Sequence, residues 1–129
     1  ISMIIKISFL FASFGGGLAV LAGAFGAHGM AGRIEQNLID TFQTGVQYQM
    51  YHCLALLLVA IMMRQWGRSP ILELSCYAFM LGIFLFSGSL YVLALKNIEW
   101  VRILPPFGGL FFVVGWCALF FSCYQSSER

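Results

Sequence analysis

The chain has 129 residues, of which 60% are hydrophobic and 9% are charged, and its formal net charge at pH 7 is +2. Soluble domains carry about 25% charged residues, so a soluble globular fold is excluded. The few basic residues form no stripe along the chain, so the charge pattern gives no support to nucleic-acid binding.

Four long windows contain no Asp, Glu, Lys or Arg, and each exceeds the roughly 20 residues with which a helix crosses a bilayer. They cover residues 7–32, 41–63, 74–95 and 103–127. Backbone groups in hydrocarbon must bond within their own segment, so each window is expected to be helical. The sequence therefore predicts an all-α membrane protein. Its expected fold is an antiparallel four-transmembrane-helix bundle, a single integral membrane domain over residues 1–129.

The first predicted helix covers residues 5–28. We expect it to stay in the protein, because its apolar run is longer than the core of a secretion signal. Small residues recur at every fourth position along it, at Gly15, Ala19, Gly23 and Ala27. Such a face lets membrane helices approach until their backbones touch. We expect it to serve packing within the bundle rather than a dedicated dimer interface.

Residues 30–46 differ from the apolar runs, because Ile34, Leu38, Phe42 and Val46 recur every four residues among polar neighbours. A single apolar stripe on a polar helix is typical of a segment that lies in the membrane interface. The alternative is an extramembrane extension of the second helix, and the pattern fits both. The predicted fold takes the first interpretation, an interfacial amphipathic segment between the first two helices.

The remaining predicted helices cover residues 47–63, 71–95 and 107–124. A tight basic turn at residues 64–70 joins the first two of these, and a Pro-Pro pair at 105–106 precedes the last. Cytoplasmic termini are favoured by four basic residues against three, with Lys6, Arg64, Arg68 and Arg129 inside and Arg33, Lys96 and Arg102 outside.

Polar residues gather where the first and third helices end and where the second and fourth begin, which in this topology is the non-cytoplasmic end. The candidate binding residues are His28, Gln47, Tyr48, His52, Ser87 and Tyr91. Three interpretations are open. In the first, the side chains hold the helices together by hydrogen bonds. In the second, they line a pocket for a lipid headgroup, a quinone-like ring or another amphiphile. In the third, the two histidines bind a metal ion or a haem.

No metal and no cofactor is predicted, because two imidazoles without a third His make a thin metal site. The cysteines at 53, 76, 117 and 123 form no Cys-x-x-Cys pattern and lie in apolar segments, where Cys usually behaves as a small hydrophobe. The chain also lacks a nucleophile elbow, an HExxH motif and a phosphate-binding loop. We therefore do not expect an enzyme.

Four motifs, GAFGAHGM, TGVQYQMYHCLALL, LFSGSLYVLAL and PPFGG, occur in this order. Together they resemble the YgdD-like family of small four-helix membrane proteins, which includes the eukaryotic transmembrane protein 256 and whose domain is one of unknown function. The resemblance covers about residues 9–121. It implies a multi-pass protein of the bacterial cytoplasmic (inner) membrane, or a mitochondrial protein in eukaryotes, and it carries over no reaction.

Two functional hypotheses follow. The leading one is a non-catalytic membrane protein that binds a lipid-like molecule or a membrane partner at the non-cytoplasmic end of the bundle. The alternative is a small transporter or channel that acts as a dimer, which the lack of a charged residue inside the apolar spans disfavours. Membrane lipids are the expected partners, and a homo-oligomer or a membrane-protein partner is left open.

Overall fold

The computed structural model describes the backbone of residues 2–127 and the side chains of residues 2–125, so Arg129, counted above among the basic residues, lies outside it. The helices are α1 (Met3–Ala24), α2 (Gln36–Trp66), α3 (Pro70–Gly82), α4 (Gly88–Lys96) and α5 (Leu104–Ser127). Three short helical segments lie between these helices. Two are π-helical, η1 (Phe25–Gly29) and η2 (Ile83–Ser87), and the third, η3 (Glu99–Ile103), is a 3₁₀-helix. Since η1 continues α1 and η2 joins α3 to α4, the described residues form four helices long and apolar enough to cross a membrane. The predicted all-α four-helix fold is confirmed.

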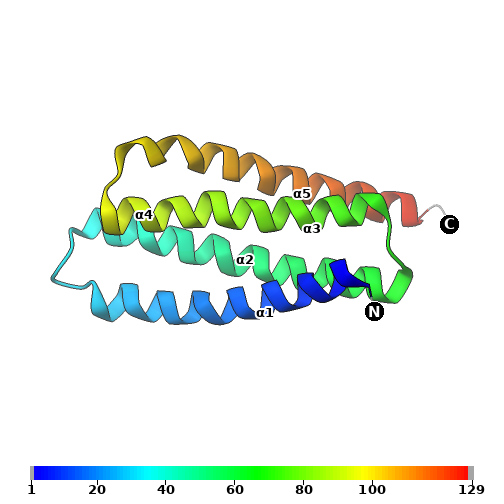
Figure 1. Ribbon diagram of the computed structural model, residues 1–129, viewed down its shortest axis with the longest axis horizontal. Coiled ribbons are helices and arrows are strands. Elements are labelled where there is room, and N and C mark those ends of the chain that lie inside the picture. The colour runs from blue at the N-terminus through cyan, green and yellow to red at the C-terminus, as the bar shows by residue number, and fades with distance from the viewer. Residues whose placement is uncertain (1, 128–129) are drawn as a thin grey trace.

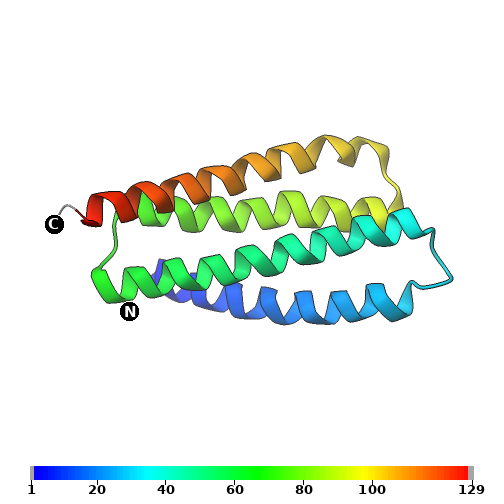
Figure 2. The ribbon, with the colours of Figure 1, turned by 180° about the vertical axis from the view of Figure 1, so that it is seen from behind.

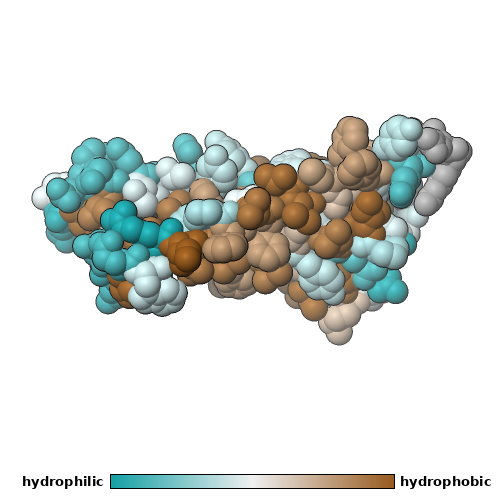
Figure 3. Space-filling model, turned by 90° about the horizontal axis from the view of Figure 1, so that it is seen from above, coloured by the Kyte–Doolittle hydropathy of each residue, from teal (hydrophilic) through white to brown (hydrophobic). Residues whose placement is uncertain are grey.

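The four membrane-crossing helices lie side by side in chain order and alternate in direction (Figures 1 and 2). α1 packs along α2, α2 packs along the combined α3–α4 helix, and α3 packs along α5. α1 and α5 therefore form the two edges. Only 28% and 22% of the residues in their apolar windows are buried, against 44% and 50% in the two central helices. Figure 3 shows hydrophobic residues along the middle of one face and hydrophilic residues toward both ends, as expected for a membrane-crossing protein.

Residues 36–46 are the first turns of α2 and not a separate interfacial helix. Ile39 and Phe42 from these turns are buried together with Met30 and Ala94 in a small apolar cluster. The neighbouring helices, rather than the membrane surface, cover the apolar side of the segment. The interfacial segment in the predicted fold is therefore replaced by its alternative, an extension of the second helix.

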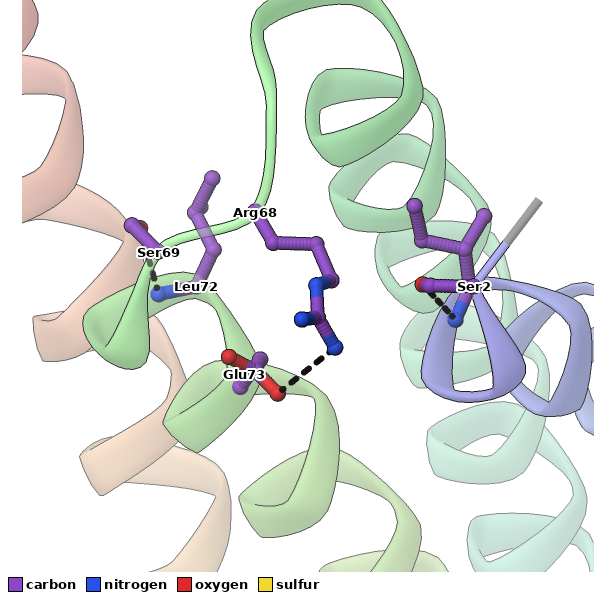
Figure 4. Close-up of polar contacts among 6 residues, drawn as sticks. Ser2, Arg68, Ser69, Leu72 and Glu73 are labelled. Atoms are coloured by element: carbon purple, nitrogen blue, oxygen red, sulfur yellow. Dashed lines mark hydrogen bonds and ion pairs between the residues drawn. The ribbon is translucent and has the colours of Figure 1, made fainter.

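The turn between α2 and α3 is set by local sequence. Gly67 has a φ of +94°, which favours glycine because it lacks a Cβ. The Oγ of Ser69 accepts a hydrogen bond of 3.3 Å from the N–H three residues later, and Pro70 occupies the first helical position, where no N–H is needed. Arg68 Nη1 lies 3.9 Å from Glu73 Oε1 across the same turn (Figure 4). The basic turn expected at residues 64–70 thus comprises the last residues of α2 and the capped start of α3.

α3, η2 and α5 approach closely where glycines take the place of side chains. A Cβ on Gly82 would lie 2.4 Å from the ring of Phe112 on α5. A Cβ on Gly108 would lie 2.4 Å from the backbone nitrogen of Phe86 in η2. Both distances are far below van der Waals contact, so these glycines set the spacing of the helices.

The small-residue face predicted along α1 packs against α2 over part of its length. Ala19 is buried, and a Cβ on Gly15 would lie 2.7 Å from the Sγ of Cys53 on α2. Gly23 has more room, since its nearest neighbour on α2 would lie 3.4 Å from an added Cβ. Ala27 is exposed. The face therefore serves packing between helices from Gly15 to about Gly23.

Gly108→Ala and Gly109→Ala form a matched pair, since the two glycines are adjacent in α5. The new methyl group at Gly108 would meet the backbone of η2, whereas nothing lies within 4 Å of a Cβ on Gly109. We expect Gly108→Ala to lower the free energy of unfolding by about 1–3 kcal/mol. Gly109→Ala should leave it unchanged or raise it by up to about 1 kcal/mol. Unfolding of the purified variants in detergent measures both, and equal stabilities would contradict the packing described.

Candidate functional site

Two sets of side chains with polar groups lie between the described helices, each set in a different helix interface. The first, here called the His52 cluster, lies between α2 and α5 and consists of Tyr48, His52, Phe112 and Trp116. The second, here called the Gln49 bridge, joins α1, α2 and α4 and consists of Gln49, Tyr91 and the carbonyl of Gly15.

His52 is buried and uses both ring nitrogens in hydrogen bonds. Trp116 Nε1 donates to His52 Nε2 at 3.0 Å, and His52 Nδ1 lies 2.7 Å from the carbonyl oxygen of Tyr48. An indole N–H only donates and a carbonyl only accepts, so the imidazole is neutral and carries its proton on Nδ1. The ring also stacks on Phe112, with 3.6 Å between centroids and 7° between planes. With both nitrogens engaged, His52 is neither a free metal ligand nor a free base.

Tyr48 lies at the outer edge of the His52 cluster and is 37% exposed. Its ring centroid is 4.7 Å from that of Phe86 and 6.1 Å from that of His52. Aromatic pairs of this kind contribute about 0.5–1.5 kcal/mol each beyond the area they bury. The cluster therefore holds α2 to α5 through stacked side chains, which favours the packing interpretation for Tyr48 and His52.

Gln49 joins three helices through its amide. Its Nε2 donates to the carbonyl oxygen of Gly15 at 2.6 Å, and the Tyr91 hydroxyl donates to its Oε1 at 2.6 Å. Because a carbonyl only accepts, the Gln49 atom beside Gly15 must be the nitrogen, and Tyr91 must then donate to the oxygen. Gln49 itself is only 7% exposed. The bridge therefore connects α1 and α4 to α2 by hydrogen bonds inside the apolar region.

Four side-chain hydrogen bonds cross from one helix to the backbone of another and end on glycine carbonyls. The four donors are Gln43, Gln49, Ser75 and Ser87, and their acceptors are Gly23, Gly15, Gly115 and Gly45, at 3.1, 2.6, 2.8 and 2.7 Å respectively. A carbonyl within a helix is shielded by neighbouring side chains. Where glycine removes that shielding, a donor on the next helix can reach the oxygen.

A groove runs between α1 and α4 over the Gln49 bridge, and we call it the α1–α4 groove. It consists of two adjoining pockets of about 360 Å³ and 390 Å³, which share Leu18, Gln49 and Tyr91. The first pocket is further lined by Phe11, Phe14, Gly15, Ile83, Phe84 and Gly88. The second is further lined by Leu21, Ala22, Phe25, Phe42 and Leu95. Phe14 and Phe84 are 71% and 66% exposed, so the groove opens on the apolar outer surface.

The structure separates the six predicted binding residues. Tyr48 and His52 belong to the His52 cluster, and Tyr91 belongs to the Gln49 bridge. Ser87 donates its hydroxyl hydrogen to the carbonyl of Gly45. His28, in η1, and Gln47, on α2, are exposed and take part in neither set.

His28 and His52 do not converge. His28 lies in η1 at the end of the first helix, whereas His52 lies sixteen residues into α2, about 24 Å along its axis. The predicted gathering of the polar residues at one end of the bundle requires α2 to begin near Gln47. Because α2 begins at Gln36, residues 47–52 lie near its middle and not at its end. Among residues 2–127, no group of three or more His, Cys, Asp or Glu side chains is arranged to hold a metal ion.

The chain matches the family model described as Protein of unknown function (DUF423) over residues 22–109. It belongs to this family. The Bacillus subtilis membrane protein YwdK is 40% identical over 99 residues, which cover 77% of this chain and 80% of that protein. The Escherichia coli inner membrane protein YgdD is 38% identical over 111 residues, 85% of this chain and 83% of that protein. No solved structure matches the chain. The resemblance to the YgdD-like family is thereby confirmed.

The sequence predicts Gln47 as a binding residue and does not predict Gln49. The structure places Gln49, and not Gln47, at the floor of the α1–α4 groove. Gln49 is one helical turn from both Gly45 and Cys53, and all three are buried. Small residues at four-residue spacing mark the packed side of a membrane helix, so this spacing is the signal that favours Gln49. Trp116 has no comparable signal, because α5 is apolar on all sides.

The Gln49 bridge can be tested with variants that keep side-chain shape. Gln49→Met leaves the Tyr91 hydroxyl without its acceptor, and Tyr91→Phe leaves Gln49 Oε1 without its donor. We expect each to lower the free energy of unfolding by about 1–2 kcal/mol. The double variant removes both partners, so its loss should be smaller than the sum of the single losses by about 0.6–2 kcal/mol.

The control for this cycle is Ser13→Ala, because Ser13 is exposed and its hydroxyl donates to the carbonyl of Phe9 within the same helix. This variant is expected to unfold like the wild type. Strictly additive losses at Gln49 and Tyr91, measured by unfolding in detergent, would contradict the bridge.

Proposed function

We propose that this chain is a non-catalytic integral membrane protein that binds a lipid-like molecule from the side, in the α1–α4 groove. One observation carries the proposal: an apolar groove on the lipid-exposed surface has the hydrogen-bonded amide and hydroxyl of Gln49 and Tyr91 at its floor. Apolar walls suit a hydrocarbon chain or ring, and the Gln49 bridge suits one polar group on the same molecule.

The size of the groove supports a ligand site. Each of its pockets, at about 360 Å³ and 390 Å³, falls within the roughly 300–1,000 Å³ typical of small-molecule sites. The rings of Phe11 and Phe84 meet edge to face across α1 and η2, with 5.4 Å between centroids. Aromatic walls of this kind offer both flat surfaces and edges to an apolar ligand.

The helix wall opposite α1 also supports a site. It changes from α-helix to the π-helical turn η2 beside the groove, and Ile83 and Phe84 of this turn line the first pocket. Single π-helical turns within α-helices occur frequently at functional sites. Gly88 follows at once, and a Cβ on it would meet nothing within 4 Å. The wall is therefore shaped to leave space where a side chain would fit.

Binding without catalysis is proposed because Ser87 and His52, the pair that could serve as nucleophile and base, are already committed to other partners. Ser87 Oγ donates to a carbonyl, and both nitrogens of His52 are hydrogen-bonded. A nucleophile needs a base within hydrogen-bond reach, and these two side chains do not form such a pair.

The relative YgdD is described as an inner membrane protein, and we propose the same location for this chain. Figure 1 shows that α1 begins and α5 ends at the same end of the molecule. We propose that this end, which carries Lys6, Arg64 and Arg68, is cytoplasmic.

Filling the groove tests the proposal. In Gly88→Leu, the new side chain would enter the first pocket without meeting a neighbour at its Cβ. Gly109→Leu is the matched control, because its Cβ is equally free and Gly109 lines neither pocket of the groove. We expect native mass spectrometry of protein purified from its host membrane to show bound lipid in the wild type and in Gly109→Leu. The bound fraction in Gly88→Leu should fall several-fold.

Two results would contradict lateral lipid binding. One is equal bound lipid in Gly88→Leu and Gly109→Leu at equal thermal stability. The other is a change of oligomeric state in Gly88→Leu alone, which would make the groove a contact between protein chains.

A further inference from the structure

We propose that the α1–α4 groove selects a neutral lipid, one whose hydroxyl or carbonyl enters the bilayer interior, over a charged phospholipid. This inference rests on the proposed function, because it names the class of molecule that the same groove would take. Three properties of the groove carry it: the depth of the Gln49 bridge, the lack of charge in the lining, and the hydrogen-bonding capacity that the bridge leaves unused.

The Gln49 bridge lies deep in the apolar layer. Its acceptor, Gly15, lies nine residues after Lys6 and thirteen before His28, about 14 Å and 20 Å along the helix axis. No ionisable side chain lies between those two positions on the helix. The hydrocarbon layer of a bilayer is about 30 Å thick, so its middle is about 15 Å from either boundary. The bridge is therefore near the middle, far from the plane in which phospholipid headgroups are anchored.

The lining of the groove offers no partner to an ion. Apart from Gln49 and Tyr91, every residue that lines the two pockets is apolar or a glycine. A phosphate placed against the bridge would lose its water and find no cation, which is strongly unfavourable in hydrocarbon. The lining therefore excludes a charged group at this depth.

The bridge leaves one donor and one acceptor for a ligand. Gln49 Nε2 carries two hydrogens, and one of them goes to Gly15 while no acceptor for the other is found among the described residues. The Tyr91 oxygen donates its hydrogen to Gln49 and keeps a lone pair. A hydroxyl group can pair with both, a ketone or ester carbonyl can pair with the N–H, and a plain chain can pair with neither. In a layer without water, the molecule that completes these bonds is favoured.

A phospholipid is the competing occupant. Leu95 lines the second pocket and Lys96 follows it at the end of α4, so a phosphate beside Lys96 could leave one acyl chain in the groove. That chain would place methylene groups against the Gln49 bridge and leave its donor and acceptor unpaired. A groove that selects neutral lipids and a groove that holds a phospholipid chain would therefore prefer different head groups on an identical chain.

Four probes with the same chain length separate these cases: oleyl alcohol, methyl oleate, octadecene and oleyl phosphate. Each is titrated into delipidated wild-type protein in detergent, and binding is followed by native mass spectrometry. We expect oleyl alcohol and methyl oleate to bind roughly three- to tenfold more tightly than octadecene, because each completes at least one hydrogen bond. Oleyl phosphate should bind no more tightly than octadecene.

Two variants locate the preference at the bridge. Gln49→Met/Tyr91→Phe keeps the shape of the floor and removes its polar atoms, so the three uncharged probes should bind it alike. Tyr91→Phe alone frees Gln49 Oε1 as an acceptor. That oxygen takes the place of the lost Tyr91 oxygen, so oleyl alcohol and methyl oleate should keep their preference over octadecene in this variant.

The outcomes distinguish the inference from the function on which it rests. Tightest binding of oleyl phosphate, or an unchanged preference in Gln49→Met/Tyr91→Phe, would overturn the selection of neutral lipids. Equal binding of all four probes that Gly88→Leu abolishes would do the same and leave lateral lipid binding standing. Failure of the wild type to bind any probe, octadecene included, would overturn lateral lipid binding itself.

Discussion

An amide side chain in a hydrocarbon layer has to find its partners inside the protein, and Gln49 finds them on two other helices. The apolar attraction that holds soluble helices together is weak here, because lipid chains are as apolar as the helix surfaces. Directional bonds and close backbone packing therefore decide where each helix lies. For the edge helix α1, the hydrogen bonds from α2 to Gly15 and Gly23 set that position. The width of the α1–α4 groove follows from it.

Glycine gives these hydrogen bonds their acceptors. Gly45 on α2 and Gly115 on α5 receive serine hydroxyls from the third helix, as Gly15 and Gly23 on α1 receive glutamine amides from the second. The same absence of a Cβ permits both the close approach and the access to the carbonyl oxygen. Small residues in this chain thus determine which helices pair and which polar atoms meet. Two of the polar sets that result are the aromatic cluster around the buried His52 and the Gln49 bridge, which borders an open groove.

The class of fold follows from the sequence, because charge-free windows of membrane-spanning length admit few structures other than helices. The rotation of each helix about its axis does not follow, since residues facing lipid and residues facing protein are equally apolar. For that reason Gln47 and Gln49 could not be told apart by hydropathy, although one is exposed and the other buried. The position of His52 depended on where α2 begins. The predicted start at residue 47 is too late, because the stripe containing Phe42 is covered by neighbouring helices and not by the membrane surface. The groove itself arises from helix order and could not be read from any single segment.

Photolabelling in native membranes tests most directly whether a neutral lipid occupies the groove. The probe is a long-chain alcohol with a diazirine beside its hydroxyl, and labelled peptides are mapped by mass spectrometry with and without excess oleyl alcohol. Labelling that the competitor removes is expected on the groove walls, at Leu18 and Leu95 and beside Tyr91. Labelling that falls evenly on the outer side of α5, at Leu110 and Val113, and that the competitor does not reduce, would show that the groove holds no preferred ligand.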